Sequence, residues 1–213
     1  MYKSTYSPSS KLVCLFVKNF VVKLDCHLTM KTLVSNLVCS ANFEPCHIRT
    51  ICHLLSTEST NTLISAFVLL NLDYCNSLLC GCPHYLLNKL QKVENNTAHL
   101  VLRVSKTDHI SPHLASLHWL LIESRIQYKL SSLCYNCLNS TAPDYLTKLL
   151  SIFKPTCQLP SFSDTSLLCI PSASTHLLGQ RSFSYAAPSV WNTPPYKIRV
   201  IKLPLSLILQ IIS

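Results

Sequence analysis

The twelve cysteines of this 213-residue chain are its first candidates for chemistry. Cys134 and Cys137 have the CxxC spacing of half a zinc site or of a redox pair. The other half of a zinc site would come from an upstream group: Cys75, Cys80, Cys82 and His84. Residues three apart on a helix share a face, and Cys is among the residue types most often buried. The pattern therefore favours core cysteines, with a cysteine-rich zinc-binding interaction module as the alternative.

Histidines form a second group, with two acids close by in sequence: His109, His113, His118, Asp108 and Glu123. Spacings of four and five place the three imidazoles along one side of a helix, as a metal site would need. Pro112 interrupts that helix, so capping or packing histidines explain the pattern better than ligands do. No metal ligands are predicted here.

Carboxylate chemistry is limited by the acid content. The chain has nine Asp and Glu residues, of which no two are adjacent or one residue apart. Two-metal catalysis needs paired carboxylates, so this class of enzyme is not expected. Ser, Cys and His are too abundant for a catalytic triad to be assigned without geometry. We predict no catalytic residue.

Basic residues point to a polyanionic partner. Lys and Arg total 18, which gives a formal charge of +9 and a pI near 9.0. Six of them fall on or beside the polar faces of two consecutive predicted helices: Lys89, Lys92, Arg103, Lys106, Arg125 and Lys129. If those faces align, they form a strip that follows a phosphate backbone. The alternative is an ordinary solvated face.

The elements that would position these residues are mainly helices. Only two glycines but 12 prolines punctuate the chain, which favours helices with Pro and Ser breaks over β-hairpins. Short strands are expected within 11–23, and a helix after Asp25 that breaks or kinks at Pro45. Further helices are expected at 56–81, 83–104, 111–117, 122–138 and 143–150. The helix within 56–81 is apolar almost all round, so we expect it to be the buried centre of the first half.

The composition changes after Pro155 to Ser, Pro and Thr with short apolar runs. We expect a linker and then an irregular, partly β C-terminal unit, whose 186–191 segment packs an aromatic residue onto the helices. Neither the run at 12–24 nor the run at 203–212 is a signal peptide or a membrane-spanning helix. The sequence thus predicts an intracellular protein without a membrane partner or a small-molecule substrate.

Four segments carry a resemblance: LDYCNSLL, LLNKLQKVENNTAHLVLR, KTDHISPHLASLHWLLIESRIQYKLSSLCYNCLNSTAPDYL and QRSFSYAAPSVWNTPPYKIR. In this order they resemble the C-terminal part of the polyprotein of non-LTR, LINE-type, jockey-like retrotransposons, over roughly Leu24 to Arg199. The resemblance implies four regions. Residues 1–30 would be a remnant of the exit strands of the reverse-transcriptase palm, and 31–154 a helical thumb-like and downstream body. Residues 155–199 would be the Ser/Pro-rich linker and small C-terminal unit, and 200–213 an aberrant apolar tail.

The resemblance implies a polymerase parent and a fragment without catalysis. The family's RNA-directed DNA polymerase binds two Mg²⁺ through paired aspartates in the palm, and no Asp-Asp occurs in this chain. No catalytic residue is therefore carried over, no cofactor is expected, and Mg²⁺ belongs only to the full-length parent. What remains is, at most, non-specific RNA or DNA binding by a reverse-transcriptase relic.

Departures from the family indicate decay of an unselected copy. Relatives tend to carry arginine at six positions of this chain: Cys39, Cys46, His47, Cys52, His99 and Cys157. An arginine codon that contains CpG becomes Cys or His by one transition, so we hypothesise a pseudogene-like fragment. The tail VIKLPLSLILQIIS replaces a basic amphipathic helix of the relatives, which is consistent with a frameshift.

Overall fold

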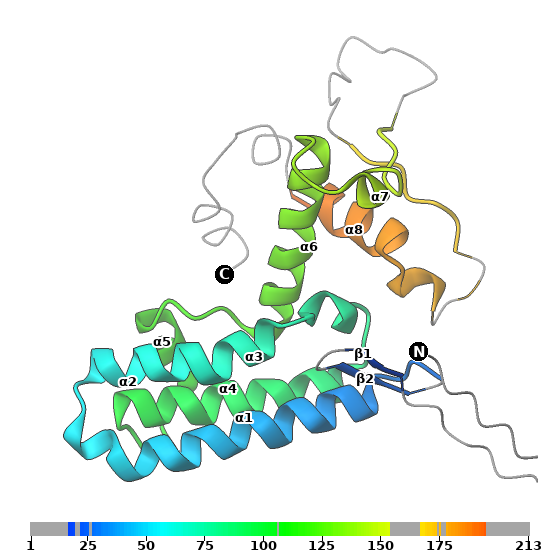
Figure 1. Cartoon of the computed structure of the whole chain (residues 1–213). Helices are drawn as coiled ribbons and strands as arrows, with labels where there is room; N and C mark the ends of the chain where they lie inside the picture. Colours follow the sequence, from blue (N-terminus) through cyan, green and yellow to red (C-terminus); the bar gives the residue numbers. More distant parts are fainter. Residues whose placement is uncertain are drawn as a thin grey trace, which may run out of the picture.

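The computed structural model describes residues 17–19, 22–25, 27–105, 107–153, 167–173, 175 and 178–194. In these ranges the chain is mainly helical, as the sequence predicts (Figure 1). The expectations for Lys106, for Cys157 and for the tail at 200–213 lie outside them. No described helix has both the length and the apolar character needed to cross a bilayer.

The N-terminal elements are a small hairpin and a long helix. Strands β1 (Val17–Asn19) and β2 (Val22–Leu24) pair antiparallel, with Val17 opposite Leu24. Between β2 and helix α1, the carboxylate of Asp25 accepts bonds from the backbone N–H and hydroxyl of Thr29, at 3.0 and 2.7 Å. These bonds order the turn that leads from the hairpin into the helix.

Helix α1 (Lys31–Ile51) runs without interruption through Pro45, so the break expected there does not occur. A proline inside a helix removes one hydrogen bond and costs about 3 kcal/mol. Here Pro45 is buried together with Ala41 and Ile48, on the side of α1 that packs along α4. Burial of this face offsets the lost bond, and packing overrides the local signal.

The next helical run spans 57–73 in three parts. Ser56 caps α2 (Thr57–Ile64) by accepting the N–H of Ser59 at 3.1 Å, at the start that the sequence predicts. A π-helical stretch (Ser65–Leu69), α3 (Leu70–Asp73) and a 3-10 turn (Asn76–Leu79) follow. Phe67 and Leu70 are 49% and 65% exposed, so this run is not the buried centre that its composition predicts.

The centre of the first half is instead helix α4 (His84–Leu102), which begins directly after Pro83. It packs against α1, α2, α5 (Ile110–Ser116) and α6 (Ile122–Leu138). Its core face is buried: Leu86, Leu87, Leu90, Val93, Ala98 and Val101. Figure 1 shows α4 lying alongside α1, with α6 standing across their direction.

The C-terminal unit is more helical than expected. After the short α7 (Asp144–Thr147) and a single β-bridge between Ile152 and Leu168, the chain forms α8 (Phe183–Asn192). The irregular, partly β prediction is therefore wrong for 183–192. Helix α8 packs along α6 and buries Trp191, so the expected docking of an aromatic residue is confirmed (Figure 1). The side chain of Asn192 holds both the N–H and the C=O of Leu168, at 3.0 and 2.8 Å.

Candidate nucleic-acid interface

Two of the predicted basic residues project from one face of α4, and a third, Arg103, directly follows the helix. At 100° per residue, Lys89 and Lys92 lie about 60° apart around the helix axis. All three are exposed, and they span about 21 Å along the axis at 1.5 Å per residue. We call this row of cations the α4 stripe. Its charges are free to meet a polyanion that runs along the helix.

Arg103 also has a structural role. It takes a left-handed conformation with φ 56° just after α4, and its Nη2 donates to the carbonyls of Cys52 and Leu55, at 2.5 and 2.6 Å. These bonds fasten the end of α4 to the turn that follows α1. They use one nitrogen of a group with five N–H donors, so an exposed Arg103 can still contact a phosphate.

Arg125 lies in a different environment. Its Nε donates to Oε1 of Glu94 and its Nη1 to Oδ2 of Asp73, both at 2.9 Å, and Nε also reaches the carbonyl of Leu120 at 2.8 Å. The side chain is 13% exposed, whereas that of Glu94 is fully buried. Burial raises the pKa of Glu94, and the charge of Arg125 opposes this rise. Arg125 is thus paired with two carboxylates, the buried Glu94 and the partly exposed Asp73.

Gln91 extends this network to the start of α6. Its Nε2 donates to Oε2 of Glu94 at 2.9 Å, and its Oε1 accepts the backbone N–H of Ile122 at 2.9 Å. The first N–H groups of a helix have no partner within the helix, so this amide caps α6 from a neighbouring element. The network of Gln91, Glu94, Arg125 and Asp73 therefore fixes how α6 sits on α4.

Lys129 is exposed one turn beyond Arg125 on α6. It lines a hollow of about 270 Å³ together with Asp73 and Arg125. Because Glu94 lies about 160° around α4 from Lys92, the residues packed on Glu94 are on the other side of that helix. The structure thus places Arg125 and Lys129 apart from the α4 stripe, and Lys106 lies outside the described residues.

The three histidines are not brought together. His109 precedes α5 and is exposed, and His118 follows α5 and lines the hollow beside Lys129. His113 instead turns to α4, where its ring meets that of His99 edge-on with centroids 6.1 Å apart. Spacing along the chain fails here because Pro112 lies within α5 and the helix ends before His118.

The CxxC cysteines lie in the core, on the inner side of α6. Cys134 and Cys137 are both buried, as the helical spacing favours. Burial, with a smaller effect from Cys137, raises the pKa of the Cys134 thiol to about 12. A thiolate is the form that binds metal or attacks a disulfide, so this thiol is poorly suited to either task at neutral pH. Within the described ranges, no three His, Cys, Asp or Glu side chains are grouped for a metal ion.

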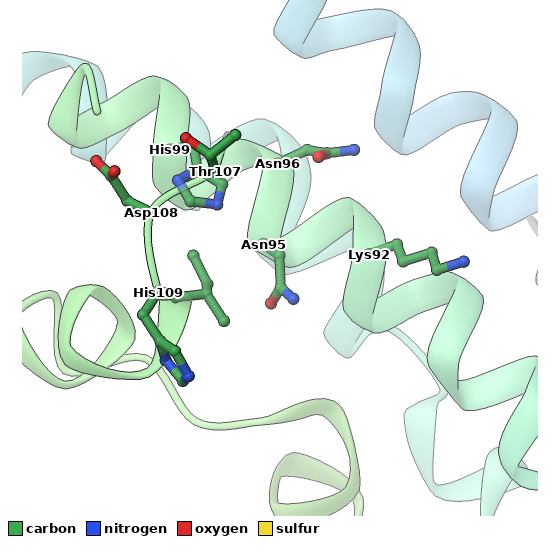
Figure 2. Close-up of a pocket in the computed structure, with 8 residues that line it drawn as sticks. Lys92, Asn95, Asn96, His99, Thr107, Asp108 and His109 are labelled. Carbon is green, nitrogen blue, oxygen red and sulfur yellow. The ribbon is translucent and has the colours of Figure 1, made fainter. Parts of the chain in front are cut away.

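A polar hollow of about 480 Å³ adjoins the α4 stripe. One wall comes from α4 and the other from the loop before α5 (Figure 2): Lys92, Asn95, Asn96, His99, Thr107, Asp108, His109 and Ile110. His99 is only 8% exposed, and its Nδ1 is buried without a hydrogen-bond partner. A buried polar atom without a partner is uncommon, which makes this hollow a candidate binding site.

Sequence reasoning missed Arg181, which joins three parts of the fold. Its guanidinium donates to the carbonyls of Leu28, Leu78 and Cys80, at 2.8, 3.2 and 3.3 Å. Gly81 makes room for this side chain, because a Cβ there would lie 3.0 Å from Cγ of Arg181. Its φ of +67° is also a conformation that glycine adopts without strain. No local pattern marks this residue, since its partners are distant in sequence.

The role of Glu94 left a trace in the sequence, because the residue falls beside Val93 on the apolar face of its predicted helix. An acid on a core face indicates a buried partner.

No protein-family model matches the chain, and the searches of curated proteins and of solved structures gave no match either. Function is therefore inferred from the chain's own residues.

Proposed function

We propose that this chain is a catalytically incomplete fragment of a retrotransposon RNA-directed DNA polymerase that retains non-specific RNA or DNA binding. The chain carries the thumb-like and downstream part of such a polymerase and no polymerase activity of its own. Binding uses the phosphate backbone, because the exposed cations of α4 form a row and not a base-reading pattern. The α4 stripe is the observation that carries the binding part of this proposal, and the resemblance of the four sequence segments carries the polymerase parentage.

The order of elements agrees with the resemblance. A two-stranded hairpin is followed by helices, as expected where palm exit strands lead into a thumb. Two of the positions where relatives tend to carry arginine, Cys52 and His99, line a hollow beside Arg103. Arginines at these positions would extend the stripe, so the fragment's affinity should be lower than its parent's.

The test is the salt dependence of RNA binding by the full chain, measured by fluorescence anisotropy of a labelled duplex. Each lost phosphate contact reduces the slope of log K against log salt by roughly 0.9. We therefore expect the double variant Lys89→Ala with Lys92→Ala to reduce that slope by about 1.8. Binding should weaken equally for unrelated sequences, because phosphate contacts do not report base identity.

Lys31→Ala with Lys148→Ala is the matched control, since both lysines are exposed and the same charge is removed. This pair should leave the slope almost unchanged. Equal effects of the two double variants would mean that net charge, and not the α4 stripe, drives binding. Absence of salt-dependent binding by the unaltered chain would refute the proposal itself.

A further inference from the structure

Two hollows meet beneath the α4 stripe and share two residues, Asn96 and His99. The first is the polar hollow of Figure 2. The second, of about 310 Å³, lies between the end of α1 and the end of α4, and its remaining lining is Arg49, Cys52, Leu100, Arg103 and Val104. We call these two adjoining hollows together the depression, and its two ends differ in chemistry.

The end between α1 and α4 suits a phosphate. Arg49 is exposed in the last turn of α1, and Arg103 is fixed opposite it by its bonds to Cys52 and Leu55. A guanidinium presents a planar fork of donors that matches phosphate oxygens and keeps its charge at every relevant pH. Among the residues that the structure describes, no carboxylate lines this hollow, so an anion there meets two cations and no opposing charge from them.

The other end suits a planar, polar group. The amide of Asn96 offers a paired donor and acceptor, as the edge of a nucleobase requires, and Asn95, whose Oδ1 accepts from Nε2 of Gln91 at 2.9 Å, adds its amide donors. The ring of His109 offers a surface on which a base can stack. His99, which lines both hollows, is more than nine-tenths buried. Its Nδ1 is buried and has no hydrogen-bond partner among the described residues.

We propose that this depression binds one unpaired nucleotide of a single strand, with its phosphate at Arg49 and Arg103 and its base beside Asn96. The inference rests on the proposed nucleic-acid binding and gives it a preference for single strands. In a duplex the base is stacked and paired, so it enters such a hollow only at the cost of unstacking. RNA and DNA supply the same phosphate and base, and either strand is a ligand.

Binding of 5′-AMP, adenosine and inorganic phosphate to the full chain tests this site by NMR titration. We expect 5′-AMP to bind more tightly than either part alone and to shift the backbone signals of Asn96 and His109. Arg49→Ala should weaken 5′-AMP about tenfold but leave adenosine unchanged, because one charge-assisted contact is lost. Asn96→Ala should weaken 5′-AMP severalfold but leave phosphate unchanged. Both residues are exposed, so neither substitution removes core packing.

The control is Lys31→Ala, which removes a cation from the other end of α1 and should leave 5′-AMP binding intact. Equal affinities for 5′-AMP and phosphate, or no effect of Arg49→Ala and Asn96→Ala, would overturn the nucleotide site. The salt dependence of duplex RNA binding, measured for the double variant Lys89→Ala with Lys92→Ala, tests the proposed function separately. Salt-dependent duplex binding without a preference for 5′-AMP would refute this inference alone.

Discussion

The two sides of α4 use charge in opposite ways. On the outer side, Lys89, Lys92 and Arg103 of the α4 stripe are exposed. The side-chain hydrogen bonds of Arg103 there go to backbone carbonyls and not to a carboxylate. On the inner side, Glu94 is buried and paired with Arg125, which also contacts Asp73. Cations that look alike in sequence are therefore available to a ligand in one place and committed to the fold in the other. Substitutions on the two sides should have separable effects.

The largest effect on stability should come from Arg125→Ala. This change leaves Glu94 buried without its countercharge, and breaking a buried pair costs about 3–5 kcal/mol. Urea denaturation followed by circular dichroism would measure the loss. Arg125→Met with Glu94→Leu should recover most of it, since no buried charge then remains unpaired and Asp73, which loses its partner, is 38% exposed. A loss below about 1 kcal/mol for Arg125→Ala would show that the inner network does not hold the fold together.

A pH-dependent effect should follow from Glu94 itself. Its pKa in the folded state is raised from the ordinary 4.5, chiefly by burial, so the folded chain holds this proton more tightly than the unfolded chain. The stability from Glu94 is complete below the unfolded pKa and declines as pH rises through the folded pKa. The difference in unfolding free energy between the unaltered chain and Glu94→Gln should therefore fall as pH rises above about 4.5. A rise would mean that pairing with Arg125 outweighs burial.

The smallest effect on stability is expected for Lys129→Ala. The residue is exposed, so the free energy of unfolding should change by no more than about 0.5 kcal/mol. The slope of log K against log salt for RNA binding by this variant is the more informative measurement. An unchanged slope would confine the interface to the α4 stripe. A reduction equal to that of Lys92→Ala would show that α6 belongs to the same interface, as the sequence alone suggests.

Local signals in the sequence predicted most helices but not their packing. Pro83 and Ser56 mark the starts of α4 and α2, because their effects on the backbone are local. Pro45 was a poorer guide, since it lies inside a helix that it does not interrupt; Pro188 likewise lies inside α8, and residues beside both prolines are buried. Burial decides these cases, and burial depends on elements that are distant in sequence.

The candidate site divides in the same way. Helical spacing is enough to place Lys89 and Lys92 on one face. It cannot show that Arg125 meets Asp73 and Glu94, which are 52 and 31 residues away. The junction at Asn96 and His99 depends on α1 and on the loop before α5, so it too emerges only from the folded chain.

Arg181 has a consequence for the order of folding. Its three bonds span between 101 and 153 residues, and they reach back to the turn before α1. A ribosome makes Leu28 early and Arg181 late, so these carbonyls cannot find their partner until most of the chain has been synthesised. Contacts of such long range slow folding, because a large loop must close before they form. The early part of the chain therefore reaches its final state only after synthesis has passed residue 181.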